Sequence, residues 1–242
     1  MTMPLFQAKL FRVAFFLAFL IFSMASLARA EHVILIHGLA RSPKSMQPME
    51  RGLQAAGYQT LNLHYPSRSK TVRALADEHL GLAIAACRKK GPGSIHFVTH
   101  SLGGILVRDY LARHDVPELG RVVMLAPPNK GSEVVDRIGH WRSFKAVNGP
   151  AGRELSTDEA GVPKTLGPVT YAVGIIAGDR SINWINSRMI PGPDDGKVSV
   201  ENTKLEGMTD HVVVHRTHPM IMKRSEVIEL TLRFLEAGSF KP

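Results

Sequence analysis

A serine surrounded by small residues is the first group in this sequence that could do covalent chemistry. Residues 97–104 read FVTHSLGG, in which two apolar residues run into Ser101 and then into the pair Gly103 and Gly104. An apolar run, small residues and then a helical pattern predict a strand, a tight turn and a helix. In that setting a strained backbone holds the serine clear of its neighbours, as the nucleophile elbow of acyl-transfer enzymes requires. An ordinary tight turn is the alternative.

The elbow needs small residues two positions before and two positions after the nucleophile, because the chain passes close to its neighbours there. Gly103 satisfies this requirement after the serine. Thr99 stands before it, where glycine is most usual, so the motif here is T-x-S-x-G. The larger, branched threonine is a departure from the expected pattern.

A general base for this serine is expected later in the chain, where His211, His215 and His218 cluster. His218 follows a predicted strand, in the loop before the last helix, from which it can reach a serine at the edge of a sheet. We therefore favour His218 over His215. Read as metal ligands, His215 and His218 lack a third ligand with matching spacing, so no metal site is predicted.

A carboxylate that orients the base is expected between the serine and the histidine in chain order. The candidates are Asp179, Asp194, Asp195 and Asp210. Asp195 is favoured, because Gly196 permits a tight turn beside it and Val198 can anchor that turn in the core. Asp179 ends a predicted strand and remains the alternative acid, whereas Asp194 is interpreted as a turn residue.

Acyl transfer also needs two backbone N–H donors aimed at the oxygen that becomes negative. Leu102, directly after the serine, is one predicted donor of this oxyanion hole. Leu39, in the loop after the strand expected at 33–36, is the other. His37 precedes the serine in the chain and is predicted to brace this loop rather than to act as the base.

The elements that would position these residues alternate between strands and helices. Strands are expected at 33–36, 60–65, 95–98, 121–126, 169–176 and 211–215, and helical spacing lies between them. The last helix is expected to start near Pro219. Such alternation predicts a mostly parallel sheet with helices on both faces and ligands at the carboxyl ends of its strands. Residues 129–166 break the pattern and predict an excursion over the sheet with one or two short helices.

The first thirty residues have the features of a secretory signal peptide. Lys9 and Arg12 precede an apolar run over 13–22, and the segment ends in Ala28-Arg29-Ala30. The sequence therefore predicts a signal peptide at 1–30 and a single domain at 31–242, exported to the periplasm or secreted. An uncleaved N-terminal anchor is the alternative, although the apolar run is short for a membrane span.

Charge and cysteine content narrow the expected partners. The net charge of the 242 residues is +9, and it falls to +6 without the basic residues of the leader. This positive balance is compatible with association at an anionic membrane surface. No run of Lys and Arg is interleaved with aromatic residues, so no nucleic-acid partner is expected. Cys87 is the only cysteine, which excludes an internal disulfide, and its helical position predicts burial. Nothing in the sequence indicates an oligomeric state.

Several stretches together resemble the α/β-hydrolase superfamily, especially its lipase and esterase branch. These are His37-Gly38-Leu39, Thr99–Gly104, Asp194–Val198 and His218-Pro219, and the order of elements agrees over nearly all of 31–242. The resemblance implies an α/β-hydrolase fold with a small cap or none. It implies that Ser101 is the nucleophile, His218 the base, Asp195 the orienting acid, and Leu39 and Leu102 the oxyanion donors.

The activity implied by the resemblance is hydrolysis of a carboxylic ester through an acyl-enzyme, with no metal or organic cofactor. The expected substrate is a small-molecule or lipid ester. An acyltransferase or a thioesterase would use the same three residues. An inactive binding protein on the same fold is a third interpretation, and it would be expected to lack one of the three roles.

Overall fold

Six parallel strands form the sheet in the part of the chain that the computed structural model describes, residues 31–242. They are β1 (His32–Ile36), β2 (Gln59–Leu63), β3 (Ile95–His100), β4 (Leu119–Leu125), β5 (Val173–Gly178) and β6 (Asp210–Val214). Their order in the sheet is β2-β1-β3-β4-β5-β6, with every neighbouring pair parallel. The predicted parallel sheet is thus confirmed. The predicted signal peptide lies outside the described residues.

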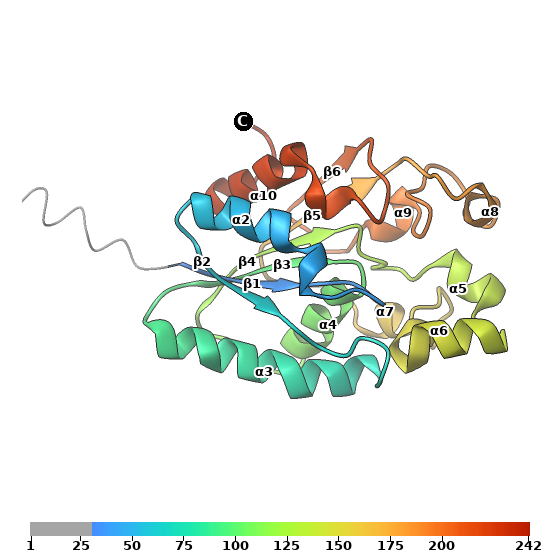
Figure 1. The fold of residues 1–242 in the computed structure, drawn as a ribbon, viewed down its shortest axis with the longest axis horizontal. Helices are drawn as coiled ribbons and strands as arrows, with labels where there is room; N and C mark the ends of the chain where they lie inside the picture. The colour runs from blue at the N-terminus through green and yellow to red at the C-terminus, as the bar shows by residue number, and fades with distance from the viewer. Residues whose placement is uncertain (1–30) are drawn as a thin grey trace, which may run out of the picture. The chain divides into compact units, whose positions relative to one another are not determined.

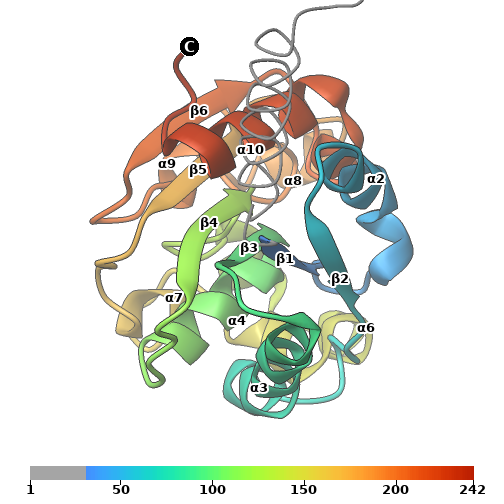
Figure 2. The same cartoon turned by 90° about the vertical axis from the view of Figure 1, so that its left-hand side faces the viewer.

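Helices cover both faces of the sheet, as the alternating pattern predicts (Figures 1 and 2). The four longest that pack on it are α2 (Gln47–Ala55), α3 (Val72–Lys90), α4 (Leu102–Leu111) and α10 (Ser225–Ala237). In Figure 1, α2 and α10 lie above the sheet, and α3 and α4 lie below it.

Two apolar layers separate these helices from the sheet, and β1 contributes to both. Ile34 and Ile36 belong to the layer that packs against α3 and α4, together with the buried Cys87. Val33 and Leu35 belong to the layer that packs against α2 and α10. Successive strand residues point to opposite faces, so a strand covered on both sides must be apolar throughout.

The other helices occupy the connections that leave the carboxyl ends of the strands. They are η1 (Pro43–Ser45), α5 (Glu133–Ile138), α6 (Arg142–Arg153), α7 (Val162–Thr165), α8 (Trp184–Ser187), α9 (Val200–Thr203) and η2 (Ile221–Lys223). Figure 1 shows α5, α6 and α8 gathered at this end of the sheet. Residues 129–166 carry α5, α6 and α7, one helix more than the sequence suggests, and we call this segment the small cap.

A buried arginine holds the small cap in place. Arg108, on α4, donates hydrogen bonds to the backbone carbonyls of Asn129, Pro163 and Gly167. The carboxylate of Glu154 also accepts a hydrogen bond from the first N–H of α3 at 2.7 Å. The small cap is therefore tied to both helices on the lower face.

Most strand ends lie within two residues of the prediction, and two boundaries differ by more. The strand expected at 169–176 is observed at Val173–Gly178, because the N–H of Val169 donates to Glu206 instead of joining the sheet. The last helix, expected from near Pro219, is interrupted: η2 ends before Arg224, whose extended backbone (φ −94°, ψ 134°) separates it from α10.

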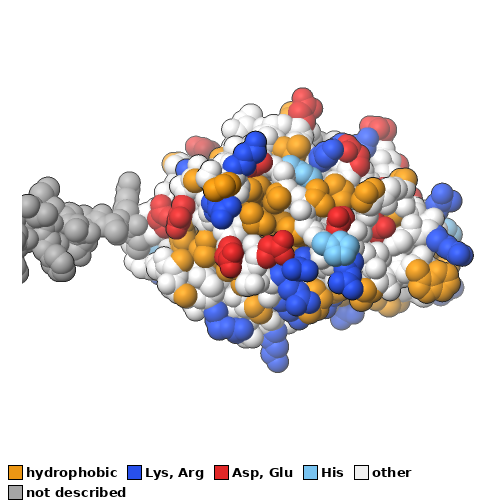
Figure 3. Space-filling view, turned by 90° about the horizontal axis from the view of Figure 1, so that it is seen from above, with side chains coloured by type: hydrophobic (Ala, Val, Ile, Leu, Met, Phe, Trp, Pro, Cys, Tyr) orange, Lys and Arg blue, Asp and Glu red, His pale blue; other side chains and the backbone are white. Residues whose placement is uncertain are grey.

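The surface over α2 and α10 mixes both signs of charge. Lys and Arg side chains are interspersed there with Asp and Glu side chains and with apolar groups (Figure 3). Within residues 31–242, no helix combines the length and the hydropathy that crossing a membrane requires.

Candidate active site

Ser101 occupies the sharp turn between β3 and α4 in a strained backbone conformation. Its φ is 52° and its ψ is −121°, a region that residues other than glycine rarely adopt. The turn is held from the neighbouring strand, because the N–H of Ser101 donates to the carbonyl of Leu125 at 2.9 Å. Ala40 and Ala126 are the other non-glycine residues of 31–242 with positive φ, and both follow neighbouring strands at the same edge. Strained backbone conformations are thus found at the serine and after the two strands that flank it.

The tight packing of this elbow explains the small residues of the motif. A Cβ atom on Gly103 would lie 2.7 Å from the backbone oxygen of Ile36, too close for any side chain. Thr99, which stands where glycine is most usual, is fully buried. Its Oγ1 atom lies 3.3 Å from the point where a Cβ of Gly104 would be. The threonine is accommodated because Gly104, the residue that faces it, has no side chain.

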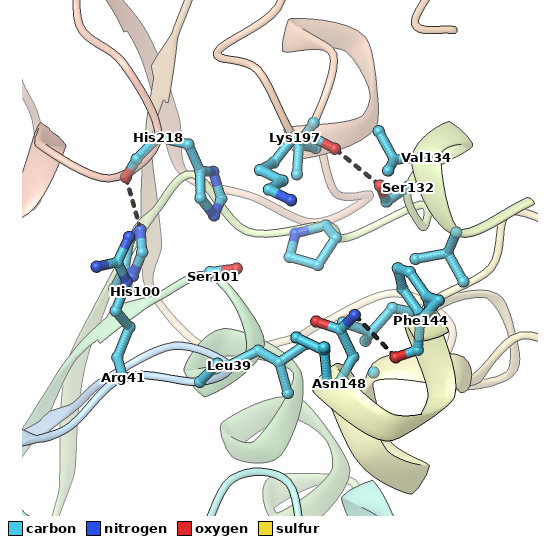
Figure 4. A pocket seen from close by; sticks show the side chains of 17 residues that line it. Leu39, Arg41, His100, Ser101, Ser132, Val134, Phe144, Asn148, Lys197 and His218 are labelled. Carbon is cyan, nitrogen blue, oxygen red and sulfur yellow. Dashed lines mark hydrogen bonds between the residues drawn. The ribbon is translucent and has the colours of Figure 1, made fainter. Parts of the chain in front are cut away.

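His218 and Asp195 form a buried pair beside the serine. The Nδ1 atom of His218 lies 2.7 Å from Oδ2 of Asp195, and both side chains are almost completely buried. His218 follows β6, and its ring lines the same cavity as Ser101 (Figure 4). Within residues 31–242 no hydrogen bond joins the Ser101 hydroxyl to His218, a looseness common in enzymes without bound substrate.

The turn around Asp195 fixes the carboxylate for this contact. Its Oδ1 atom accepts hydrogen bonds from the N–H groups of Lys197 and Val198, both at 2.9 Å. Its backbone oxygen accepts from the N–H of His218 at 3.0 Å, so the two residues are joined twice. Gly178, at the end of β5, makes room, since a Cβ there would lie 3.0 Å from the Cβ of Asp195. The preorganised carboxylate has one oxygen left for the imidazole.

The alternative acid, Asp179, pairs with a different histidine. Its Oδ1 atom lies 2.9 Å from Nδ1 of His215, and the His215 side chain is 71% exposed. Neither residue lines the cavity that contains Ser101. The structure therefore brings Asp195 and His218 to the serine and leaves Asp179 and His215 at the surface. Asp194 caps its own turn, accepting from the N–H of Gly196, as its interpretation as a turn residue predicts.

A cavity of about 350 Å³ opens in front of the serine, between the sheet and the small cap. Most of its wall is apolar, formed by Leu39, Pro128, Val134, Phe144, Leu155 and Val198 among others. Figure 4 shows Phe144 and Val134 on the side of Ser101 away from His100 and Arg41. This size and lining are typical of sites for small apolar ligands.

The predicted oxyanion donors flank the serine. Leu102 opens α4, and N–H groups in the first turn of a helix have no acceptor within that helix. The N–H of Leu39 donates no hydrogen bond to any residue from 31 to 242. Both donors are thus free to bind an oxygen that lies above the serine.

His37 braces the loop that carries Leu39. Its ring stacks on Tyr65 with centroids 4.3 Å apart, and the Tyr65 hydroxyl donates to the backbone oxygen of His37 at 2.6 Å. Burial lowers the pKa of His37 below its ordinary value, so the ring is neutral at neutral pH. These contacts hold the oxyanion loop against the sheet.

His100 is a residue of the site that sequence reasoning missed. It is fully buried, and its Nε2 atom lies 3.0 Å from the backbone oxygen of His218. Because a carbonyl can only accept, Nε2 carries the hydrogen, and Nδ1 has no partner among the described residues. Burial and the facing His218 hold the pKa of His100 well below its usual range. Its position beside the serine in T-H-S was the available signal, but the sequence could not show what it touches.

Comparison with known proteins identifies the fold. No family model and no curated protein matches the sequence. Among solved structures, the mature form of the lipase BlEst2 from Bacillus licheniformis aligns with a TM-score of 0.68 and 18% identity, over 87% of this chain and 93% of that chain. Phospholipase PlaB from Legionella pneumophila aligns with a TM-score of 0.65 and 19% identity, over 88% of this chain and 60% of that chain.

A third similar structure is the metagenomic carboxyl esterase MGS0156, with a TM-score of 0.58 and 18% identity over 81% of this chain and 66% of that chain. The six-stranded parallel sheet with helices on both faces agrees with these neighbours. Residues 31–242 therefore have the α/β-hydrolase fold, in the form seen in bacterial lipases and esterases.

Proposed function

We propose that this protein is a serine hydrolase that cleaves carboxylic esters through an acyl-enzyme. Ser101 is the nucleophile, His218 the general base and acid, and Asp195 the group that orients His218. The observation that carries the proposal is the convergence of a strained serine and a buried Asp–His pair on one apolar cavity. Each of the three roles needs a different local geometry, and all three occur together here.

In the first half of the reaction, the Ser101 oxygen attacks the ester carbonyl carbon while His218 takes the hydroxyl proton at Nε2. The carbonyl oxygen becomes negative, and the N–H groups of Leu39 and Leu102 stabilise it. When the intermediate collapses, the bond to the leaving alcohol breaks and His218 returns the proton to that oxygen. An acyl-enzyme remains on Ser101.

In the second half, water replaces the alcohol. His218 takes a proton from the water, which attacks the acyl carbon and releases the carboxylic acid, and the proton returns to Ser101. Asp195 holds the neutral imidazole of His218 in the productive tautomer and stabilises the transient imidazolium. Oδ2 of Asp195 faces Nδ1, so Nδ1 carries the hydrogen of the neutral ring and Nε2 is the atom that accepts and returns the transferred proton.

The chemical class of the acyl group follows from the cavity wall. Leu39, Phe144 and Leu155 present apolar surface near the serine, which suits a hydrocarbon chain. Several similar structures carry the names lipase or phospholipase, and this supports a lipid ester as the substrate. Action at a membrane surface, and export through the signal peptide predicted at 1–30, belong to the same proposal.

Hydrolysis of a series of p-nitrophenyl esters by the mature protein tests this function, with Ser101→Ala as the matched variant. The proposal predicts measurable turnover by the wild type and a loss of roughly 10³-fold or more in kcat for the variant. Circular dichroism spectra that agree would show that both proteins are folded. Equal rates for the two proteins, or no turnover by the folded wild type, would favour a binding protein on this fold.

A further inference from the structure

The position of His218 divides the site into two sides. A general acid must face the oxygen that it protonates, so the leaving alcohol has to lie on the His218 side of Ser101. The acyl group then lies on the opposite side, against Phe144 and Val134. A second cavity, of about 390 Å³, adjoins His218 and is bounded by Arg41, Asn183, Trp184 and Pro219 among others. The leaving group therefore enters this second cavity.

Two cations line both cavities, Arg41 and Lys197. Figure 4 shows the ammonium end of Lys197 turned into the cavity beside His218, and Arg41 beside His100. Within residues 31–242, the charged groups of these two side chains make no ion pair and no hydrogen bond, whereas Lys130 and Arg113 on other surfaces pair with carboxylates. The side chains of Arg41 and Lys197 are therefore free to bind a ligand.

The two cations also affect each other. Although Lys197 is accessible to solvent, the surrounding protein displaces enough water to lower the pKa of its ammonium group; Asp195 opposes this shift and Arg41 adds to it. Asp195 offsets only part of the unfavourable environment of Lys197, and an anion between the two cations would relieve their mutual repulsion. The guanidinium fork of Arg and the compact ammonium of Lys both suit phosphate oxygens.

We propose, on the basis of ester hydrolysis at Ser101, that Arg41 and Lys197 bind a phosphate carried by the leaving group. The preferred substrates are then acyl esters or thioesters whose leaving alcohol or thiol carries a phosphate, with the acyl chain in the apolar cavity and the phosphate in the second cavity. The leaving group supplies the phosphate either as a glycerol phosphate or as a phosphopantetheine thiol, and the experiment below distinguishes the two sources.

Two matched substrate pairs test this proposal. The first pair is 1-hexanoylglycerol 3-phosphate and 1-hexanoylglycerol, and the second is hexanoyl-phosphopantetheine and hexanoyl-pantetheine. For one pair or both, the wild type is expected to prefer the phosphorylated member by about tenfold or more in kcat/KM. The preference should shrink as salt is added, because the two cations are accessible to solvent.

Charge-removing variants connect the preference to the two residues. Lys197→Gln and Arg41→Gln are each expected to reduce the ratio of the two kcat/KM values by about tenfold. Lys44→Gln is the matched control, because Lys44 is exposed, lies three residues from Arg41 and lines neither cavity. It should leave the ratio unchanged.

The outcomes separate this inference from the function on which it rests. A preference seen only with the glycerol pair, or only with the thioester pair, supports the phosphate site and identifies its source. Hydrolysis of the neutral substrates at rates equal to the phosphorylated ones overturns the phosphate site and leaves ester hydrolysis intact. A preference that persists in both variants overturns the roles of Arg41 and Lys197. No turnover of any of the four substrates by folded protein contradicts the proposed function itself.

Discussion

The imidazole of His218 and the carboxylate of Asp195 lie 2.7 Å apart in a buried pair, while a second His–Asp pair, His215 and Asp179, lies 2.9 Å apart at the surface. Both pairs satisfy the chain order that a catalytic triad requires after Ser101. Burial and the shared cavity distinguish them, because only the His218 pair is excluded from water beside the serine. The same substitution can therefore be made in the buried and in the exposed pair, and its effects on catalysis can be compared.

Replacing Asp195 by Asn should reduce kcat for ester hydrolysis roughly 10³- to 10⁴-fold, because an amide in this place no longer holds His218 in the productive tautomer. Asp179→Asn is the control, and it should stay within about twofold of the wild type, since its pair is exposed and outside the cavity. Steady-state kinetics on one p-nitrophenyl ester measures both variants. If Asp179→Asn were the more damaging of the two, the assignment of the acid would be wrong.

Acidification should destabilise the folded protein through its buried histidines. The pKa of His100 is held well below the ordinary value of 6.5, chiefly by burial. The unfolded chain takes up a proton below about pH 6.5 while folded His100 stays neutral, so stability falls as the pH falls through that value. The contribution is at most about 1.4 kcal/mol per pH unit for one such group.

His100→Gln tests this effect, because the glutamine amide can still donate to the backbone oxygen of His218 but does not titrate. The loss of melting temperature between about pH 7.5 and about pH 5.5 should be smaller in the variant than in the wild type. The pKa values of His37, His79, His96 and His211 are also lowered by burial, so part of the acid sensitivity should persist. Identical pH profiles would show that His100 does not contribute.

The two adjacent glycines after the serine should respond very differently to alanine. In Gly103→Ala the new Cβ meets backbone oxygen of Ile36 at 2.7 Å, so α4 must shift from β1, at a cost of about 1–3 kcal/mol and with loss of activity. In Gly104→Ala the nearest atoms are at 3.3 Å and include the movable side chain of Met124.

The better helix propensity of alanine, about 1 kcal/mol, should offset most of the crowding in Gly104→Ala. Urea denaturation and ester kinetics on both variants measure the difference. A Gly103→Ala variant as stable and as active as Gly104→Ala would contradict the close approach of the elbow to β1.

Much of the fold follows from sequence pattern for a simple reason. Strands such as Val33–Ile36 are covered on both faces, so they read as unbroken apolar runs. Glycine follows the ends of the helices α2, α3 and α10. The positions of Ser101, Leu39 and Leu102 follow as well, because each lies directly after a strand at one edge of the sheet.

The remaining features depend on contacts between distant segments. Nothing local to Asp179 or Asp195 shows which histidine each will meet, since the loops after β5 and β6 decide that. The hydrogen bond between His100 and His218 joins residues 118 positions apart. The start of β5 also depends on a contact outside its own segment. The N–H of Val169 donates to the backbone oxygen of Glu206 and therefore does not join the sheet.

Labelling with a fluorophosphonate probe, read by intact mass and peptide mapping, tests the central claim that Ser101 is an activated nucleophile. The account predicts a single adduct per chain, located on Ser101 and absent from folded Ser101→Ala protein. No adduct on the folded wild type, or an adduct that persists in the variant, would contradict it.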